Sequence, residues 1–286
     1  LRHGLLPPDP FRVLRHVPGV LSRLPSRGLQ PPVVGTAHSM QTDCPEVAAV
    51  VVVVLAGLEG GFGTVGQVQR NAQSLHLGQQ GRAEIGQAMA EQATKMTYYS
   101  SFGHHTTIPV AELSAKLASL APGPLNHVIY GSGGSMANDT TVRLVHFYFN
   151  QLGMPDKKMV ITRENGYHGS TYLAMSMTGI DYDHIGFDVI GEPLIQRVSG
   201  PDLYRRPDGT TPEEYTGLLL DEFRTKVEAL GPENVAAFFA EPIMGAGGVL
   251  LPPPGYLPGM RDLCTEYRIL FVSDEVVTAF GRLGHF

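Results

Sequence analysis

Three features of the sequence combine residue types suited to chemistry with turns or strand ends that would expose them. They are the glycine turn Gly131-Ser-Gly-Gly-Ser135, the pair Tyr167-His168 between glycines, and the carboxylates Glu241 and Asp274 after apolar runs. A glycine turn that opens a helix offers free backbone N–H groups and a positive dipole end, which suit a phosphate. An aromatic side chain between glycines can lie flat on a planar ring. A carboxylate at the end of a buried strand stays ionised only when it meets a cation.

Together these features complement pyridoxal phosphate, whose ring nitrogen must be kept protonated by an acidic side chain. Each feature alone also has a structural interpretation. The glycines form a tight turn in many proteins, Tyr167 is also compatible with a core position, His168 with a structural hydrogen bond, and Glu241 with a polar strand end. Asp274 is the strongest functional candidate, because it directly follows the apolar run Ile269-Leu-Phe-Val-Ser273.

Alternating strand and helix patterns surround these residues. Strands are predicted over 126–130, 158–162, 235–240 and 269–273, and helices over 83–97, 136–151, 170–178 and 256–267. Strands that are apolar along their whole length and alternate with helices indicate an α/β fold with a mainly parallel sheet covered on both faces. Because ligands of such sheets bind beyond the carboxyl ends of the strands, we expect the candidate residues to meet in one crevice.

The helix after the glycine turn has the clearest local signals. Ser135 is placed to cap its amino end, Asp139 is expected in its first turn, and Val142, Val145 and Phe149 lie along one face. That face is therefore expected to pack against the sheet.

Composition excludes several classes of function. The chain has 286 residues, of which 43% are hydrophobic and 17% charged, as in globular proteins. A net charge of -6 offers no basic field for nucleic acid. The most apolar run, 47–58, is shorter than the ~20 residues that cross a membrane. The two cysteines, Cys44 and Cys264, lie far apart in the sequence, which favours a reducing compartment and hence the cytoplasm.

Six longer motifs resemble the class III aminotransferases, in particular their ω-amino acid or amine:pyruvate branch. The motifs are Met96-Thr-Tyr-Tyr-Ser-Ser-Phe102, Gly133-Gly-Ser-Met-Ala-Asn-Asp-Thr140, Glu164-Asn-Gly-Tyr-His-Gly169, Ala240-Glu-Pro-Ile-Met-Gly-Ala-Gly-Gly248, Pro252-Pro-Pro-Gly-Tyr256 and Ser273-Asp-Glu-Val-Val-Thr-Ala-Phe-Gly-Arg282. The resemblance implies the pyridoxal-phosphate fold type I and covers part of the large domain, 81–286, without the small C-terminal domain. It also implies small-molecule amine donors and keto acid acceptors, and a homodimer for the full-length protein.

The same resemblance assigns roles to individual residues. Gly133, Gly134 and Ser135 would bind the cofactor phosphate, Tyr167 would stack on the ring, Glu241 would help to hold the site, Asp274 would pair with the pyridine nitrogen, and Val276 would pack beneath the ring. His168 is included in the cofactor-binding set, and Tyr98 and Tyr99 are expected near the substrate entrance. No metal site is expected.

The sequence departs from the family pattern in two places. The family has Ser, Cys or Thr where Gly133 stands and Glu where Met136 stands. The Schiff-base lysine of the family lies beyond the Asp274 motif, and therefore beyond Phe286. We accordingly expect the full-length parent to transfer an amino group from an amine or ω-amino acid to a keto acid such as pyruvate, and this chain to be inactive.

Residues 1–80 differ from the rest of the chain. They contain proline and arginine clusters, a valine block and no lysine or tyrosine, and they lack helical or strand periodicity. We expect an irregular leader that is not native family sequence and that reflects a shifted reading frame or a wrong gene model.

Four alternatives remain open. A non-catalytic or inert fragment of the pyridoxal-phosphate fold is the first. A nicotinamide-dependent oxidoreductase is less consistent, because Glu164 follows Gly134 by 30 residues rather than ~20 and Met136 replaces a glycine of the fingerprint. A serine hydrolase built on Ser135 lacks an assigned acid and base. A metal site at His104 and His105 lacks a third ligand.

Overall fold

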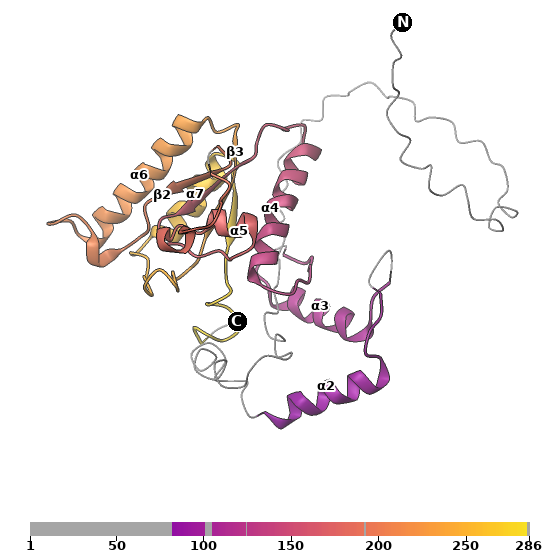
Figure 1. Cartoon of the computed structure of the whole chain (residues 1–286). Helices are drawn as coiled ribbons and strands as arrows, with labels where there is room; N and C mark the ends of the chain where they lie inside the picture. The colour runs from indigo at the N-terminus through magenta and orange to yellow at the C-terminus, as the bar shows by residue number, and fades with distance from the viewer. Residues whose placement is uncertain (1–81, 101–104, 124, 192, 285–286) are drawn as a thin grey trace, which may run out of the picture. The chain divides into compact units, whose positions relative to one another are not determined.

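The computed structural model describes residues 82–284 except 101–104, 124 and 192 (Figure 1). The described residues all fall within the second of the two units into which the chain divides, Cys44–Phe286. The expected leader, 1–80, and His104 lie outside the described residues.

Helices and strands alternate along the described chain. Before the sheet come α2 (Ala83–Lys95), α3 (Ile108–Leu120) and α4 (Gly134–Gln151). The strands are β1 (Met159–Arg163), β2 (Ile195–Val198), β3 (Val235–Ala240) and β4 (Leu270–Ser273). Between them lie α5 (Tyr172–Met177), the 3-10 helices η2 (Asp181–His184) and η3 (Leu203–Arg205), α6 (Pro212–Leu230) and α7 (Tyr256–Glu266).

The four strands form one parallel sheet in the order β2-β1-β3-β4. Ile161 in β1 aligns with Phe238 in β3, which in turn aligns with Phe271 in β4. All six residues of β3 are buried, as expected for a central parallel strand with both faces covered. The predicted α/β class with a mainly parallel sheet is confirmed.

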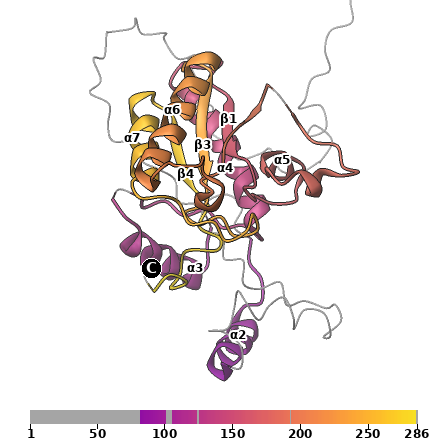
Figure 2. The ribbon, with the colours of Figure 1, turned by 90° about the vertical axis from the view of Figure 1, so that its left-hand side faces the viewer.

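Helices cover both faces of the sheet (Figure 2). Successive residues of β3 point to opposite faces, so Phe238 packs in the cluster formed with α6 and α7, and Phe239 packs in the cluster formed with α4. The predicted apolar face of the helix after the glycine turn is confirmed, because Val142, Val145 and Phe149 are all buried in the second cluster.

Apart from the short 3-10 helices, three elements were not among those predicted, namely α3, β2 and α6. β2 has only four residues, two of them polar, which is too short for a periodic signal. α6 begins with a capping box in which Thr211 and Glu214 satisfy each other's backbone N–H groups, and Pro212 occupies the first turn. It ends at Gly231, whose φ of +81° favours glycine.

Three local predictions were wrong. Residues 126–130 do not form a strand, and only Val128 makes an isolated bridge, because none of the strands β1–β4 lies beside this run to pair with it. α4 begins at Gly134 with Gly133 as its N-cap, so Ser135 does not cap the helix. Asp139 lies beyond the first turn and accepts a hydrogen bond from the Ala174 N–H instead.

The packing of α6 on the sheet gives a testable prediction. Phe223 is completely buried, and its ring meets that of Phe238 edge-on at 5.0 Å between centroids. Phe223→Ala should lower the free energy of unfolding by about 3–5 kcal/mol, because it leaves a cavity between helix and sheet. Leu218→Ala on the exposed side of the same helix should cost about 0.5 kcal/mol or less. Urea denaturation of both variants measures the difference, and equal losses would contradict this packing.

Candidate cofactor site

Polar residues follow three neighbouring strands at the carboxyl edge of the sheet. Glu241 comes directly after β3 and Asp274 directly after β4. The backbone N–H of Asp274 donates to the carbonyl oxygen of Ala240 at 2.9 Å, which extends the ladder between these strands by one residue. Tyr167 and His168 lie in the loop that follows β1.

Asp274 is the centre of a buried hydrogen-bond network. Its Oδ2 accepts a bond from Nδ2 of Asn138 and one from Nδ1 of His168, both at 2.9 Å. The His168 side chain is fully buried and that of Asp274 is 6% exposed. A carboxylate oxygen can only accept, so Nδ1 of the His168 ring carries a proton. Nε2 of the same ring is buried without a hydrogen-bond partner among the described residues.

The environment of Asp274 keeps its carboxyl group ionised. Burial by itself raises the pKa of Asp274, but the hydrogen bond and charge of His168, followed by the bond from Asn138, outweigh burial and bring the pKa below its ordinary value of 3.8. The site therefore contains a carboxylate that is largely withdrawn from water and negatively charged at neutral pH.

Asp274 retains an oxygen for a ligand. Oδ1 accepts only a long bond, 3.4 Å, from the backbone N–H of Val276, whereas Oδ2 already has two partners. A protonated ring nitrogen is a donor and a cation, and it would satisfy both the free lone pairs and the charge of this carboxylate.

The amino end of α4 provides donors for an anion. The first helical hydrogen bond runs from the N–H of Ala137 to the carbonyl of Gly133, so the N–H groups of residues 134–136 are not used inside the helix. Ser135 Oγ accepts a bond from the N–H of Ser170 at 2.9 Å, which leaves its own proton to donate. These donors and the helix dipole fit a phosphate group.

Two glycines allow the three loops to approach one another. A Cβ on Gly134 would lie 3.1 Å from Cγ2 of Val276. A Cβ on Gly169, whose φ is +131°, would lie 2.4 Å from Oγ of Ser135 and 2.7 Å from its Cα. The loop after β1 and the loop after β4 are therefore both packed against the start of α4, which joins the anion donors to the Asp274 network.

Glu241 ties the loop after β1 to the loop after β3. Its Oε1 accepts a bond from the N–H of Tyr167 and its Oε2 one from the N–H of Gly245, both at 2.9 Å. The Glu241 carbonyl oxygen accepts a bond from Nη2 of the buried Arg163 at 2.6 Å. Glu241 thus fixes the backbone that carries Tyr167 and leaves the Tyr167 side chain half-exposed.

The eight residues expected to bind the cofactor lie at the start of α4 and in the loops that follow β1, β3 and β4. The two tyrosines expected at the substrate entrance do not join this group. Tyr98 and Tyr99 are 82% and 50% exposed. Tyr99 makes an edge-on ring contact with His105. Among the described residues, neither tyrosine forms a hydrogen bond to the Asp274 network.

Two residues that support the network were not singled out from the sequence. Asn138 donates both to Asp274 and to the His168 carbonyl oxygen, the latter at 2.7 Å. It lies three residues after Ser135, so helical periodicity places it on the same side of α4, and that spacing was the available signal. Thr178 accepts the His168 N–H at 3.0 Å through its hydroxyl, and only the tertiary structure shows this contact.

None of the five lysines of the chain belongs to this cluster. Lys95, Lys116 and Lys226 lie on α2, α3 and α6, and Lys157 and Lys158 precede β1 at the opposite edge of the sheet. Burial lowers the pKa of Lys157 to about 8, and its Nζ donates to the carbonyl of Pro232.

The described part of the chain contains neither a metal-binding cluster nor a membrane-spanning helix. No group of three or more histidine, cysteine, aspartate or glutamate side chains is arranged to bind a metal ion. The helices there lack the length and apolar character that crossing a lipid bilayer requires.

The close approach of Gly169 to Ser135 gives a second prediction. Gly169→Ala should both strain the backbone and push the loop away from α4, so we expect a loss of more than about 2 kcal/mol in the free energy of unfolding. Gly186→Ala is the matched control, because Gly186 also has a positive φ but open space around its Cβ position. Denaturation measurements in which both variants lose the same amount would show that the contact with Ser135 is unimportant.

A third prediction concerns the pH dependence of stability. Because the pKa of Asp274 is lower in the folded state, its carboxylate stabilises the fold above pH ~4, and this contribution is lost as the pH falls through the folded-state value. Asp274→Asn should therefore cost about 1–3 kcal/mol at pH 7. The cost should shrink at about pH 3, as urea denaturation at the two pH values can measure. Asp262→Asn, at an exposed position of α7, is the control. A cost that does not change with pH would contradict the ionised state.

Comparison with known proteins places this site in a family. The family model for class-III aminotransferases matches residues 72–286. The putrescine–pyruvate aminotransferase of Pseudomonas aeruginosa is 41% identical over 204 residues, which are 71% of this chain and 44% of that protein. The diaminobutyrate–2-oxoglutarate transaminase of Halomonas elongata is 39% identical over 207 residues, with the same two coverages.

Solved structures give the same result. The ω-transaminase of Pseudomonas jessenii, in complex with PMP, is 40% identical with a TM-score of 0.68, over 70% of this chain and 44% of that one. A thermostable (S)-enantioselective ω-transaminase of Thermomicrobium roseum is 37% identical with a TM-score of 0.69, over 71% of this chain and 45% of that one. The chain thus spans less than half the length of these relatives, and the resemblance inferred from its motifs is confirmed. It belongs to the class III aminotransferases, a family of pyridoxal-phosphate enzymes.

Proposed function

We propose that the protein of which this chain is a part transfers an amino group from an amine or ω-amino acid to a keto acid such as pyruvate, with pyridoxal phosphate as cofactor. The observation that carries the proposal is the buried, ionised carboxylate of Asp274, held by His168 and Asn138 next to the start of α4. Family membership and the resemblance to a transaminase in complex with PMP support it.

The residues present fit this cofactor at each of its ends. The N–H groups of residues 134–136 and the hydroxyl of Ser135 would bind the phosphate, and Oδ1 of Asp274 would accept the proton-bearing ring nitrogen. Val276 and Tyr167 are both partly exposed and would lie against the ring. When bound, pyridoxal phosphate supplies an electron sink for the carbon that loses or gains the amino group.

The supporting residues keep the ring nitrogen protonated. The two bonds to Oδ2 hold the Asp274 carboxylate in one orientation and favour its negative charge, so a proton on the ring nitrogen remains there. Arg163 and Glu241 act at a distance from the reacting atoms, because they position the loop that carries Tyr167 and His168.

We assign the covalent attachment of the cofactor to a lysine outside this chain. Lys157 and Lys158 precede β1, at the edge of the sheet opposite Asp274, and the other three lysines lie on α2, α3 and α6. The 286-residue chain alone is therefore proposed to bind the cofactor weakly and without turnover.

The names of relatives suggest the class of donor. They name putrescine, diaminobutyrate and gamma-aminobutyrate as substrates of those proteins. These compounds share a primary amine at the end of a short aliphatic chain, and we propose this class of donor for the present protein. Pyruvate and 2-oxoglutarate, which the same names give, are the candidate acceptors.

We also propose that the complete protein is a homodimer in the cytoplasm. The helix α2 has no buried residue, and its apolar side chains Ile85 and Met89 are exposed together with Met96 just after it, which supports a further partner for this helix. The wide separation of Cys44 and Cys264 in the sequence and the burial of Cys264 as a free thiol support a reducing compartment.

The fourth prediction tests the function directly. A version of the protein extended to the length of its relatives should form alanine from pyruvate with putrescine or gamma-aminobutyrate as donor, and light scattering should give the mass of two chains. Asp274→Asn should lower kcat/KM at least ~100-fold, because the ring nitrogen loses its anionic partner. Asp262→Asn on the surface of α7 should leave kcat/KM unchanged.

The same preparations separate the parts of the proposal. After borohydride reduction, mass spectrometry should find the cofactor on a lysine of the extended protein and on none of the five lysines of the present chain. Full turnover by the 286-residue chain would contradict the assignment of the lysine. Reduction of a nicotinamide cofactor without amino transfer would contradict the function itself.

A further inference from the structure

The hydroxyl of Thr178 contacts the backbone on both sides of the His168 side chain. Thr178 is the residue that follows α5, and it is completely buried. Its Oγ1 accepts the backbone N–H of His168 at 3.0 Å and lies 3.1 Å from the carbonyl oxygen of Gly169. One side chain outside the loop after β1 therefore reaches two of the peptide groups of that loop.

The single proton of this hydroxyl serves Gly169. A second acceptor, the carbonyl oxygen of Ala174, lies 3.2 Å from Oγ1, but it already accepts the N–H of Thr178 itself at 3.0 Å. Among the described residues, the Gly169 carbonyl has no other donor. Because a hydroxyl has one proton and two lone pairs, it can accept from His168 and donate to Gly169 at the same time.

One of the two peptide groups leads to the start of α4. The carbonyl oxygen of the peptide between Gly169 and Ser170 faces Thr178, and the N–H of the same peptide donates to Oγ of Ser135 at 2.9 Å. Because a peptide group is planar, bonds at both of its ends fix its orientation. Thr178 and Ser135 thus hold this peptide from opposite ends.

The other peptide group leads to the Asp274 network. The N–H of the peptide between Tyr167 and His168 donates to Thr178. Asn138 holds the next peptide by donating to the His168 carbonyl at 2.7 Å. The backbone of His168 is therefore fixed before and after its α-carbon, and its ring lies where Nδ1 donates to Asp274.

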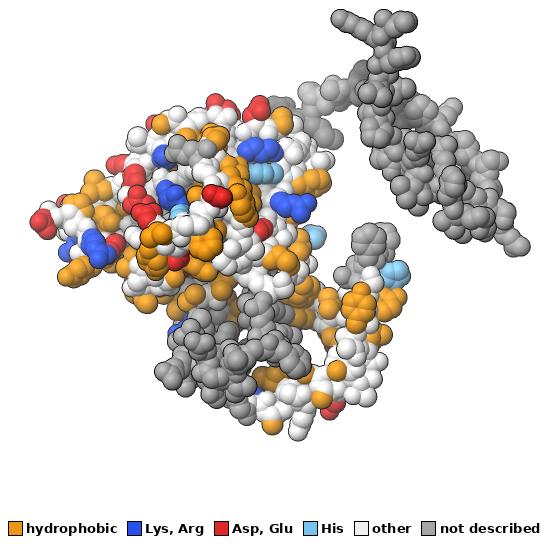
Figure 3. Space-filling view, viewed as in Figure 1, with side chains coloured by type: hydrophobic (Ala, Val, Ile, Leu, Met, Phe, Trp, Pro, Cys, Tyr) orange, Lys and Arg blue, Asp and Glu red, His pale blue; other side chains and the backbone are white. Residues whose placement is uncertain are grey.

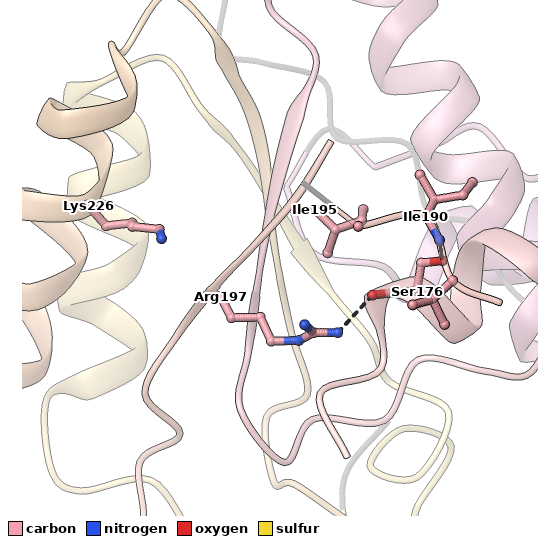
Figure 4. Close-up of a pocket in the computed structure, with 7 residues that line it drawn as sticks. Ser176, Ile190, Ile195, Arg197 and Lys226 are labelled. Atoms are coloured by element: carbon pink, nitrogen blue, oxygen red, sulfur yellow. Dashed lines mark hydrogen bonds between the residues drawn. The ribbon is translucent and has the colours of Figure 1, made fainter. Parts of the chain in front are cut away.

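Thr178 is anchored to the sheet by a side chain from β2. Nη2 of Arg197 donates to the carbonyl oxygens of Ser176 and Thr178 at 3.0 and 2.8 Å. Figure 4 shows the guanidinium of Arg197 directed at Ser176. The Thr178 hydroxyl therefore belongs to a segment whose position is set by β2 rather than by the loop that it holds.

A threonine at the end of a helix also has a simpler role. Its hydroxyl often bonds the carbonyl oxygen four residues earlier, as the contact with Ala174 would do here. That role involves neither the His168 N–H nor the Gly169 carbonyl. It gives no reason for the shorter contacts to be those with the loop.

We propose that Thr178 is a positioning residue for the cofactor site, whose hydroxyl sets the His168–Asp274 bond and the orientation of Ser135 together. Without this hydroxyl, the buried N–H of His168 loses its acceptor, and the loop must move to satisfy it. Such a movement disturbs the partner of the ring nitrogen and a phosphate donor at once. The effect on the cofactor rests on the proposed function, whereas the effect on His168 does not.

The fifth prediction is read from the Nδ1 proton of His168, in the extended protein without cofactor. A proton between an imidazole and a buried carboxylate gives a downfield NMR signal, and the signal that Asp274→Asn removes is the one required. Thr178→Val keeps the shape of the side chain without the hydroxyl and should shift or broaden this signal. Thr178→Ala, which lacks the same hydroxyl, should do the same, and Thr178→Ser should leave the signal in place.

Thr216→Val is the matched control for this change. Thr216 is also a buried threonine, and its Oγ1 donates to the carbonyl oxygen of Pro254 at 2.9 Å. It lies on the buried side of α6, whose solvent-facing side carries acidic side chains (Figure 3). Thr216→Val should lower stability in urea denaturation by an amount comparable with Thr178→Val, and it should leave the His168 signal unchanged.

Cofactor binding gives the second readout. In titrations of the cofactor-free extended protein with pyridoxal phosphate, Thr178→Val should raise the dissociation constant at least ~10-fold, because a buried N–H loses its partner. Thr178→Ser and Thr216→Val should remain within about twofold of the unsubstituted protein.

Two results would overturn the role of Thr178. One is an unchanged His168 signal in Thr178→Val and Thr178→Ala. The other is an equal effect of Thr178→Val and Thr216→Val on the signal and on the dissociation constant. Failure of the unsubstituted extended protein to transfer amino groups would instead contradict the proposed function, and the His168 signal would still decide the role of Thr178.

Discussion

The structure depends most on the burial of the Asp274 carboxylate as an anion. A charge removed from water is costly unless hydrogen bonds and an opposite charge compensate for it. Here His168 and Asn138 supply two bonds to one oxygen, and the other oxygen is left for a cationic ligand. The two supporting side chains come from α4 and from the loop after β1. A single electrostatic requirement therefore fixes the relative positions of three segments that are far apart in the sequence.

Close backbone contact is the second condition for this arrangement. The loop after β1 can reach α4 only because Gly169 has no side chain, and Val276 can reach the same helix only because Gly134 has none. Glu241 adds a link on the other side of the loop by accepting the N–H of Tyr167. The free N–H groups of α4, the side chains of Tyr167 and Val276 and the ionised carboxylate thus lie at one edge of the sheet, which is the pre-organisation that a cofactor site needs.

The candidate anion site at the start of α4 uses positive potential without a charged side chain. Its donors are backbone N–H groups and a helix dipole, which suit a phosphate that is attached to a ring held elsewhere. This site is visible in the sequence as a glycine turn.

The sequence by itself determined the α/β class, the parallel strands β1, β3 and β4 and the family, because apolar runs, glycine turns and motifs are local signals. The residues that it assigns to the cofactor remain a prediction. It also predicted a strand over 126–130 and a helix cap at Ser135, and both predictions were wrong. A strand forms only where a neighbouring strand pairs with it. The first residue of a helix depends on the backbone conformation of the whole preceding turn. Only the tertiary structure showed that Thr178 and Arg163 support the site and that Asn138 donates to Asp274. The physical reason is that these contacts join residues distant in the chain, and their geometry is set by packing between elements rather than by local periodicity.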